Sequence, residues 1–254
     1  MKLIVLLFAA LSLSGIRSPY KGIVGTGATY VAAGLALDAG FPSVTTATTT
    51  LNGGMTLASS TFSTTGIRTI VVAAAYNAFD SGGNPPTLAW TGGTPACAGA
   101  FSAVTSSANN VSYNLSGIWS ATTSANCTNV GVTLSRAQNN SGANDAAGIA
   151  VFSFSNVGSF GTPVQNNDNG SALGVTRATL TTVVGSYVVA VSCFGGDNST
   201  TAAGTQTSAF GIRNGSSDEN QAAYTQATGT STLIGWGTGA SISWVGFSAV
   251  EIKQ

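Results

Sequence analysis

Residues 242–252 read Ile-Ser-Trp-Val-Gly-Phe-Ser-Ala-Val-Glu-Ile, and this stretch indicates the fold. Two sets of side chains alternate along it, one beginning with Ile242 and Trp244, the other including Val245 and Phe247. Successive side chains of a β-strand point to opposite faces of a sheet. One set therefore lines a core, and the other lies on a covered or outer face. The stretch predicts a strand inside a layered β-structure.

Similar runs occur along most of the chain. They are rich in Val, Ile, Thr and aromatic residues, and Gly/Asn/Asp/Ser clusters suited to tight turns separate them. The predicted strands cover residues 67–76, 87–90, 111–120, 130–136, 148–154, 176–183, 187–194, 222–228 and 242–252. No stretch shows sustained apolar residues at helical spacing. Strands at this spacing predict an all-β fold, an antiparallel β-sandwich or jelly roll over residues 61–254.

Two of these runs resemble one another. Residues 69–76 read Thr-Ile-Val-Val-Ala-Ala-Ala-Tyr, and residues 186–193 read Ser-Tyr-Val-Val-Ala-Val-Ser-Cys. Both are apolar on both faces and are flanked by glycine. Two interpretations stay open: the runs are corresponding central strands of two sheets, or they are alike only because buried strands generally are.

The composition excludes several classes of function. The 254 residues include no histidine and only 8 Lys+Arg and 8 Asp+Glu. Without histidine there is no imidazole general base, Ser-His-Asp relay or imidazole metal ligand. Without a Lys/Arg cluster or net charge, nucleic acid is not an expected partner. A polar but uncharged surface makes free monomers poorly soluble, which favours assembly into a homo-oligomer.

The acidic residues do not predict an active site. Asp80, Asp168 and Asp197 lie in Gly/Asn-rich turns, where Asp commonly bonds to the backbone, and Asp218-Glu219 is the one adjacent pair. We interpret them as solvated turn residues rather than a glycosidase pair. Residues 166–170 and 196–200 offer oxygen ligands for Ca²⁺, but each supplies one carboxylate and neither completes a calcium loop. We expect no enzyme activity, cofactor or metal, with an ordered Ca²⁺ as the alternative.

The first 60 residues differ from the rest. Residues 1–16 are apolar after Lys2, and residues 17–60 are a Gly- and Thr-rich connector with one or two short strands. The apolar run is too short to span a membrane, which takes about 20 residues. It predicts an assembly arm that another subunit buries, through Leu3, Ile4, Val5, Leu6, Leu7, Phe8, Leu11 and Leu13. The alternative is a signal peptide over residues 1–15 that is removed.

Cysteines and tryptophans supply the remaining candidates. Cys97 and Cys127 both lie in turn-like contexts and can form a disulfide in an oxidising compartment. The three cysteines lack the paired spacing of a zinc site. Trp90 and Trp236 lie at strand ends next to glycine, where an exposed ring could stack on a sugar.

Four stretches resemble a family of proteins. Residues 70–75 (Ile-Val-Val-Ala-Ala-Ala), 86–90 (Pro-Thr-Leu-Ala-Trp), 185–191 (Gly-Ser-Tyr-Val-Val-Ala-Val) and 242–252 resemble β-sandwich proteins of tailed bacteriophages, of the head-decoration, fibre or tail-appendage type. The resemblance covers residues 61–254. It implies a non-enzymatic virion component that docks on other virion subunits by its N-terminal arm and displays a sandwich. The alternative is a secreted or cell-surface bacterial lectin-like or adhesin domain that binds glycans after signal-peptide removal. A polysaccharide-degrading enzyme is the third interpretation.

Overall fold

The computed structural model describes residues 34–49, 55–77, 87–92, 99–108, 114–123, 126–136, 145–168, 176–196, 200–214, 218–238 and 242–254. The described residues all belong to one compact unit, Ala33–Gln254. These residues form antiparallel sheets and no helix, which confirms the expected all-β sandwich. Accordingly, no helix among them is long and apolar enough to cross a membrane. The jelly-roll alternative stays a prediction.

The first ten strands form a sandwich of two sheets, the N-terminal sandwich. Its inner sheet has β10 (Asp145–Ser155), β5 (Thr69–Asn77), β8 (Asn114–Thr122) and β7 (Ser102–Ala108) in this order, with β1 (Ala36–Leu37) and β2 (Ser43–Thr49) along the free edge of β10. Its outer sheet is centred on β9 (Cys127–Arg136), with β3 (Met55–Ala58) and β4 (Phe62–Thr64) on one side and β6 (Thr87–Gly92) on the other. Leu57, Leu88 and Leu134 of the outer sheet pack against the inner sheet.

The last nine strands form a second sandwich, the C-terminal sandwich. Its inner sheet has β19 (Ile242–Lys253), β14 (Tyr187–Gly196), β17 (Asp218–Gln226) and β16 (Thr207–Asn214), with β11 (Ser159–Phe160) and β12 (Val164–Asp168) along the free edge of β19. Its outer sheet has β13 (Arg177–Thr181), β18 (Ser231–Thr238) and β15 (Thr200–Ala202). Leu180, Ile234 and Trp236 pack against the inner sheet and form the core between the two.

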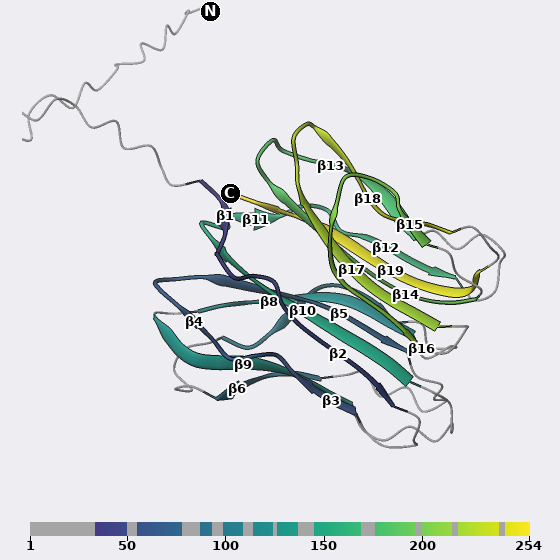
Figure 1. Ribbon diagram of the computed structural model, residues 1–254. Coiled ribbons are helices and arrows are strands. Elements are labelled where there is room, and N and C mark those ends of the chain that lie inside the picture. Colours follow the sequence, from purple (N-terminus) through teal and green to yellow (C-terminus); the bar gives the residue numbers. More distant parts are fainter. Residues whose placement is uncertain are drawn as a thin grey trace, which may run out of the picture. The chain divides into compact units, whose positions relative to one another are not determined.

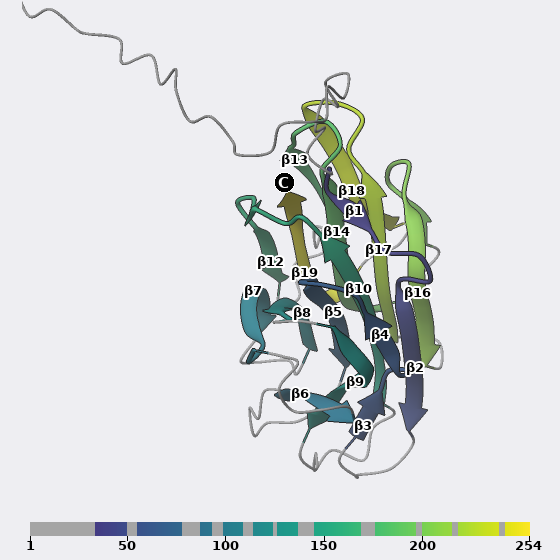
Figure 2. The ribbon, with the colours of Figure 1, turned by 90° about the vertical axis from the view of Figure 1, so that its left-hand side faces the viewer.

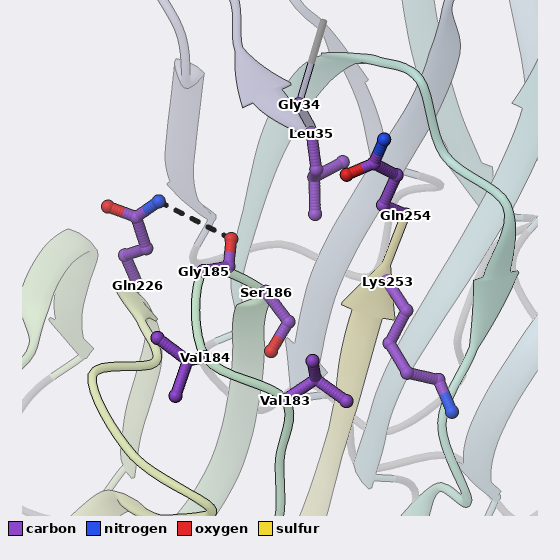
Figure 3. Close-up of a pocket in the computed structure, with 9 residues that line it drawn as sticks. All are labelled: Gly34, Leu35, Val183, Val184, Gly185, Ser186, Gln226, Lys253 and Gln254. Atoms are coloured by element: carbon purple, nitrogen blue, oxygen red, sulfur yellow. Dashed lines mark hydrogen bonds between the residues drawn. The ribbon is translucent and has the colours of Figure 1, made fainter. Parts of the chain in front are cut away.

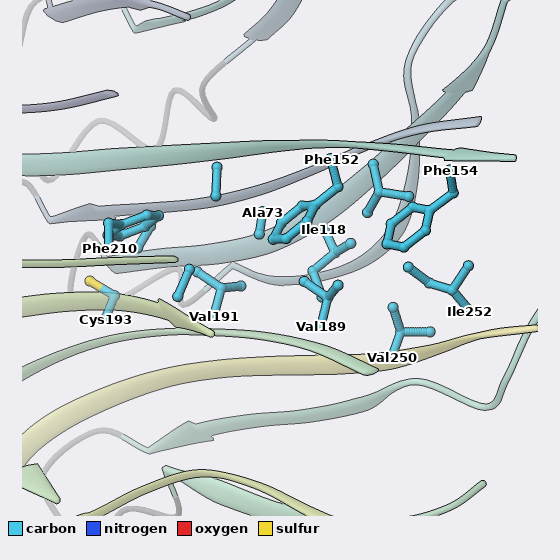
Figure 4. Close-up of a cluster of buried hydrophobic side chains, with 14 residues drawn as sticks. Ala73, Ile118, Phe152, Phe154, Val189, Val191, Cys193, Phe210, Val250 and Ile252 are labelled. Carbon is cyan, nitrogen blue, oxygen red and sulfur yellow. The ribbon is translucent and has the colours of Figure 1, made fainter. Parts of the chain in front are cut away.

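The two inner sheets pack face to face, so the folded unit has four layers. In Figures 1 and 2, β13 and β18 lie at the top and β3 and β6 at the bottom, with the inner sheets between them. Phe152 and Phe154 of one inner sheet meet Val189, Val191 and other apolar residues of the opposite one (Figure 4). Both inner sheets are therefore covered on both faces, which explains strands that are apolar on both sides.

The two sandwiches repeat one topology. Each strand of one takes the place of a strand of the other, in the pairs β1/β11, β2/β12, β5/β14, β6/β15, β7/β16, β8/β17, β9/β18 and β10/β19, while β13 stands where β3 and β4 stand. One bulge also recurs at the equivalent position, between Ala103 and Thr105 in β7 and between Ser208 and Phe210 in β16. Of the two interpretations of the resemblance between residues 69–76 and 186–193, the first therefore holds, because β5 and β14 are corresponding central strands.

Strands β5 and β14 run in the same direction, which gives the folded unit two distinct ends. Phe154, which lies opposite the first residue of β5, contacts Tyr187 at the start of β14 in a tilted arrangement, with ring centroids 5.3 Å apart. At the other extremity the Cys193 thiol donates a hydrogen bond to the carbonyl of Tyr76, with an S–O distance of 3.2 Å. We call the end where β5 and β14 begin the proximal end, and the opposite one the distal end.

The chain enters and leaves the described unit at the proximal end. Ala36 pairs with Ser155 and Ser159 with Lys253, so β1, β11 and the C-terminus lie together, on the left of Figure 1. The distal end holds the last residues of eight strands, Thr49, Asn77, Ala108, Arg136, Asp168, Gly196, Asn214 and Thr238.

Two expectations about domains need correction. Strands β1, β2 and β3 belong to the sheets, so the sandwich begins at Ala36 rather than near residue 61. The reason is that β2, Ser-Val-Thr-Thr-Ala-Thr-Thr, is an edge strand with exposed residues such as Val44 and Thr46, so its sequence is that of a connector. Residues 61–254 are also not one sandwich but parts of two. The arm residues from Leu3 to Leu13 lie outside the described residues.

Candidate functional site

The turn between β13 and β14 is the most exposed apolar element that the structure describes. Val183 and Val184 are 57% and 65% exposed. The sequence assigned Val183 to the end of a strand over residues 176–183, but β13 ends at Thr181 and the chain reverses there. Gly185 has φ = +87°, a conformation that glycine adopts without strain and that the reversal uses.

Hydrogen bonds fix this turn on both sides. The Thr182 N–H donates to the Thr230 carbonyl at 3.0 Å, and the Gly185 N–H donates to the Ala227 carbonyl at 2.8 Å. Both acceptors lie in the neighbouring turn between β17 and β18. The Gln226 side-chain amide adds a bond to the Gly185 carbonyl at 3.3 Å. The backbone therefore holds the two valines toward solvent in one arrangement.

A buried carboxylate completes the turn. Glu251 of β19 is 3% exposed, and its Oε1 accepts hydrogen bonds from the Val183 N–H at 2.6 Å and from the Ser186 hydroxyl at 2.7 Å. A buried carboxylate is stable when such donors satisfy it. Glu251 thus ties the turn to β19, one residue from Ile252 of the central core.

The turn forms one wall of a groove with a volume of about 300 Å³. Leu35 and Gly34, the first described residues, form part of the opposite wall, together with the end of the chain; Figure 3 shows all nine residues, Gly34, Leu35, Val183, Val184, Gly185, Ser186, Gln226, Lys253 and Gln254. In that view the side chains of Leu35 and Val183 point toward the space between them, and the Lys253 side chain extends away from Leu35. The groove thus combines an apolar surface with a polar rim.

The N-terminal sandwich presents a related feature at the same end. Ile67, in the turn just before β5, is 65% exposed. We call the turn that carries Val183 and Val184 the valine turn. The Ile67 turn is equivalent to it in the repeated topology, because the hydrogen bond from Thr123 N–H to the Arg68 carbonyl corresponds to the one from Ala227 N–H to the Ser186 carbonyl, both at 2.8 Å. Single exposed apolar residues are ordinary on protein surfaces. Here the three most exposed large apolar side chains of the described residues share one end.

The two tryptophans predicted to contact a sugar lie in different sandwiches. Trp236 is only 6% exposed and belongs to the core between β18 and the inner sheet, so the prediction of an exposed ring is wrong. Gly235, with φ = +114°, turns the strand so that Trp236 points inward rather than marking a strand end. Trp90 is half-buried: its ring stacks on Phe101 at 4.7 Å, and its N–H donates to the Gly99 carbonyl at 2.9 Å.

The predicted disulfide and turn carboxylates have mixed outcomes. Cys127 is buried against Phe62 and Trp90, while Cys97 lies outside the described residues, so their bond stays a prediction. Asp80 and Asp197 also lie outside them. Asp168 is the last residue of β12, opposite Val245, and not a turn residue. Among the residues that the structure describes, no three His, Cys, Asp or Glu side chains come together as a metal site.

Sequence reasoning missed a buried polar cluster at the distal end. Glu219 was expected to be solvated, but it lies in β17 and is 9% exposed. Its carboxylate forms an ion pair with Arg213 at 3.1 Å and accepts hydrogen bonds from Thr200 at 3.1 Å and from the Gln221 amide. These residues come from three strands that meet beside the outer sheet. The alternation of Glu219, Gln221 and Ala223 on one strand face was the available signal.

Comparisons with protein-family models, curated proteins and solved structures find no match to this chain.

Proposed function

We propose that this chain is a non-enzymatic structural protein of a bacteriophage virion, a capsid decoration, fibre or tail appendage. It attaches to other virion subunits, including copies of itself, by its proximal end. The distal end faces outward.

One observation carries this proposal: the exposed apolar side chains and the entry point of the chain occupy the same end. Ile67, Val183 and Val184 are each more than half exposed there, and the two valines line one groove with Gly34 and Gln254. Water penalises exposed apolar surface by roughly 25 cal/mol per Å². A rigid turn that holds two valines in water gains free energy when a partner covers them.

The contacts of the carboxylates support a structural role over a catalytic one. Glu251 holds the valine turn, Glu219 is paired with Arg213, and Asp38 forms an ion pair with Arg68 at 2.7 Å. Two of these contacts join segments that are distant in sequence, Glu251 with Val183 and Asp38 with Arg68, while Glu219 and Arg213 join the neighbouring strands β17 and β16. The complete absence of histidine removes the commonest general base.

The glycan-binding alternative gains no support from the tryptophans. Sugar stacking needs an open ring face, but Trp236 is in a core, and the Trp90 ring stacks on Phe101 and also packs against Phe62 and Cys127.

Mass spectrometry of purified phage particles whose genome encodes this chain tests the proposal. We expect peptides of this chain to copurify with the particles at a fixed ratio to the capsid protein, including peptides from residues 1–15. Peptides found only in the particle-free fraction, with an N-terminus near Gly15, would contradict the proposal and favour a secreted domain.

A further inference from the structure

We propose that the groove at the proximal end receives the apolar segment Leu3–Leu13 from a second copy of this chain. The inference deepens the proposed function, since it names one attachment site and its occupant.

The groove and the segment have matching chemistry. Leu35, Val183 and Val184 present branched apolar side chains, and the segment carries leucine, isoleucine, valine and phenylalanine without a charge between Leu3 and Leu13. Burial of apolar surface is the main favourable term in protein association. Gln226 and Gln254 at the rim offer amide groups for the backbone of a bound segment.

The position of the groove and the length of the chain before it make the contact feasible. The first described residue, Gly34, lines the groove, and residues 14–33 separate it from the apolar segment. An extended chain covers about 3.3–3.6 Å per residue, so a linker of this length can reach a neighbouring copy. Neighbouring copies do not repel one another, because the chain carries equal numbers of acidic and basic residues.

A second copy, rather than the chain's own segment, is the occupant that follows from the proposed attachment of copies at their proximal ends. A groove of about 300 Å³ accepts only part of a run that contains eight large apolar side chains. The rest stay in water unless further protein covers them. In an assembly of several copies, the equivalent turn with Ile67 offers additional apolar contact at the same end.

The test compares two variants of the full chain by sedimentation velocity. The groove variant carries Val183→Ser and Val184→Ser, and the arm variant carries Leu6→Ser and Leu7→Ser. We expect wild type to self-associate and each variant to raise the dissociation constant about tenfold or more. The control variant, Leu233→Ser, removes an apolar side chain that is 39% exposed on β18. It should associate like wild type.

Mixing the variants distinguishes the occupants. The groove variant retains an intact arm and the arm variant an intact groove, so an equal mixture should form heterodimers with one functional contact each. A wild type that stays monomeric means that the segment does not bind the groove of another copy, which overturns the proposal. A mixture that stays monomeric while wild type associates also overturns it. Association of both variants at the wild-type dissociation constant also overturns it. Circular dichroism checks that the variants keep the β-fold; because Val183 and Val184 are exposed, we expect no change.

A second measurement does not depend on these substitutions. A photo-crosslinking amino acid replaces Val184 in the full chain, and this protein is mixed with ¹⁵N-labelled wild type. We expect crosslinks from position 184 to labelled residues 3–13. Crosslinks only to unlabelled arms, or to other regions, would overturn the inference. A chain that is present in virus particles but fails these tests keeps its proposed function and loses only this docking mode.

Discussion

Glu251 shows how one residue determines the shape of the candidate site. It lies in a strand whose neighbours Val250 and Ile252 are fully buried, yet its carboxylate satisfies the Val183 N–H and the Ser186 hydroxyl. Glu251→Ala leaves both donors without this acceptor and should lower the free energy of unfolding by about 2–4 kcal/mol in urea titrations. Glu251→Gln keeps an accepting oxygen and should lose clearly less. Equal losses in the two variants would show that these hydrogen bonds do not stabilise the turn.

The disulfide is a second prediction at this scale. Cys127 is buried beside Trp90, and the Trp90 N–H bonds to the carbonyl of Gly99, two residues after Cys97 in sequence. Protein produced in an oxidising compartment should therefore have an intact mass lower by two hydrogens than reduced protein, with peptides around Cys97 and Cys127 linked. Cys193 is the internal control, since its thiol is buried against the Tyr76 carbonyl between the inner sheets and should stay a thiol. A linkage that includes Cys193 would contradict the topology.

At the scale of strands, β18 shows where glycine is required. Gly235 has φ = +114°, and a Cβ there would clash with the Thr176 carbonyl oxygen and lie 2.6 Å from the Arg177 Cα. Gly235→Ala should reduce the free energy of unfolding by about 2–5 kcal/mol, from backbone strain plus overpacking. Gly211→Ala on β16 is the matched control, because nothing lies within 4 Å of the added carbon. It should change stability by less than about 1 kcal/mol. Similar urea midpoints for both variants would contradict this account.

The strands also show what the sequence could and could not predict. The apolar runs became strands, but several polar or glycine-containing strands were missed, among them β7, β12, β16 and β18. Gly211 interrupts the apolar pattern of β16, and Gly235 and Gly237 interrupt that of β18. The valine turn was missed because Val183 extends the pattern of the strand before it. The similarity of β5 and β14 was visible, yet an alignment of their shared Val-Val-Ala sequences makes Val71 equivalent to Val188. In the structure Val71 is equivalent to Val189, because both side chains face the core between the two inner sheets. Strands covered on both faces lack the alternation that fixes register.

At the scale of the whole molecule, the repeat alters how stability is distributed. Each inner sheet uses the other as its cover, and the shared core contains Phe152, Phe154, Val189 and Val250, all fully buried. A sandwich separated from its partner would expose this entire face to water. The packing of the two halves on one another was not predictable from composition, because a polar, Ser/Thr-rich outer strand and a connector have similar sequences.

The final prediction follows from that shared core. Phe152→Ala removes a ring that stacks beside Phe154 and contacts Tyr224 of the other sandwich edge-on, at 5.4 Å between ring centroids. Its loss should reduce stability by about 3–5 kcal/mol. Because neither sandwich can keep its inner face buried without the other, both should unfold in a single transition, before and after the substitution.

Tryptophan fluorescence can follow each half separately. Trp236 and Trp244 are replaced by Phe to report on the N-terminal sandwich, and Trp90 and Trp119 are replaced to report on the C-terminal one. Phe152→Ala should shift the two midpoints equally relative to each reporter background. A shift confined to the N-terminal reporter would show that the halves are independent domains, and the four-layer core would then be a contact between two stable sandwiches.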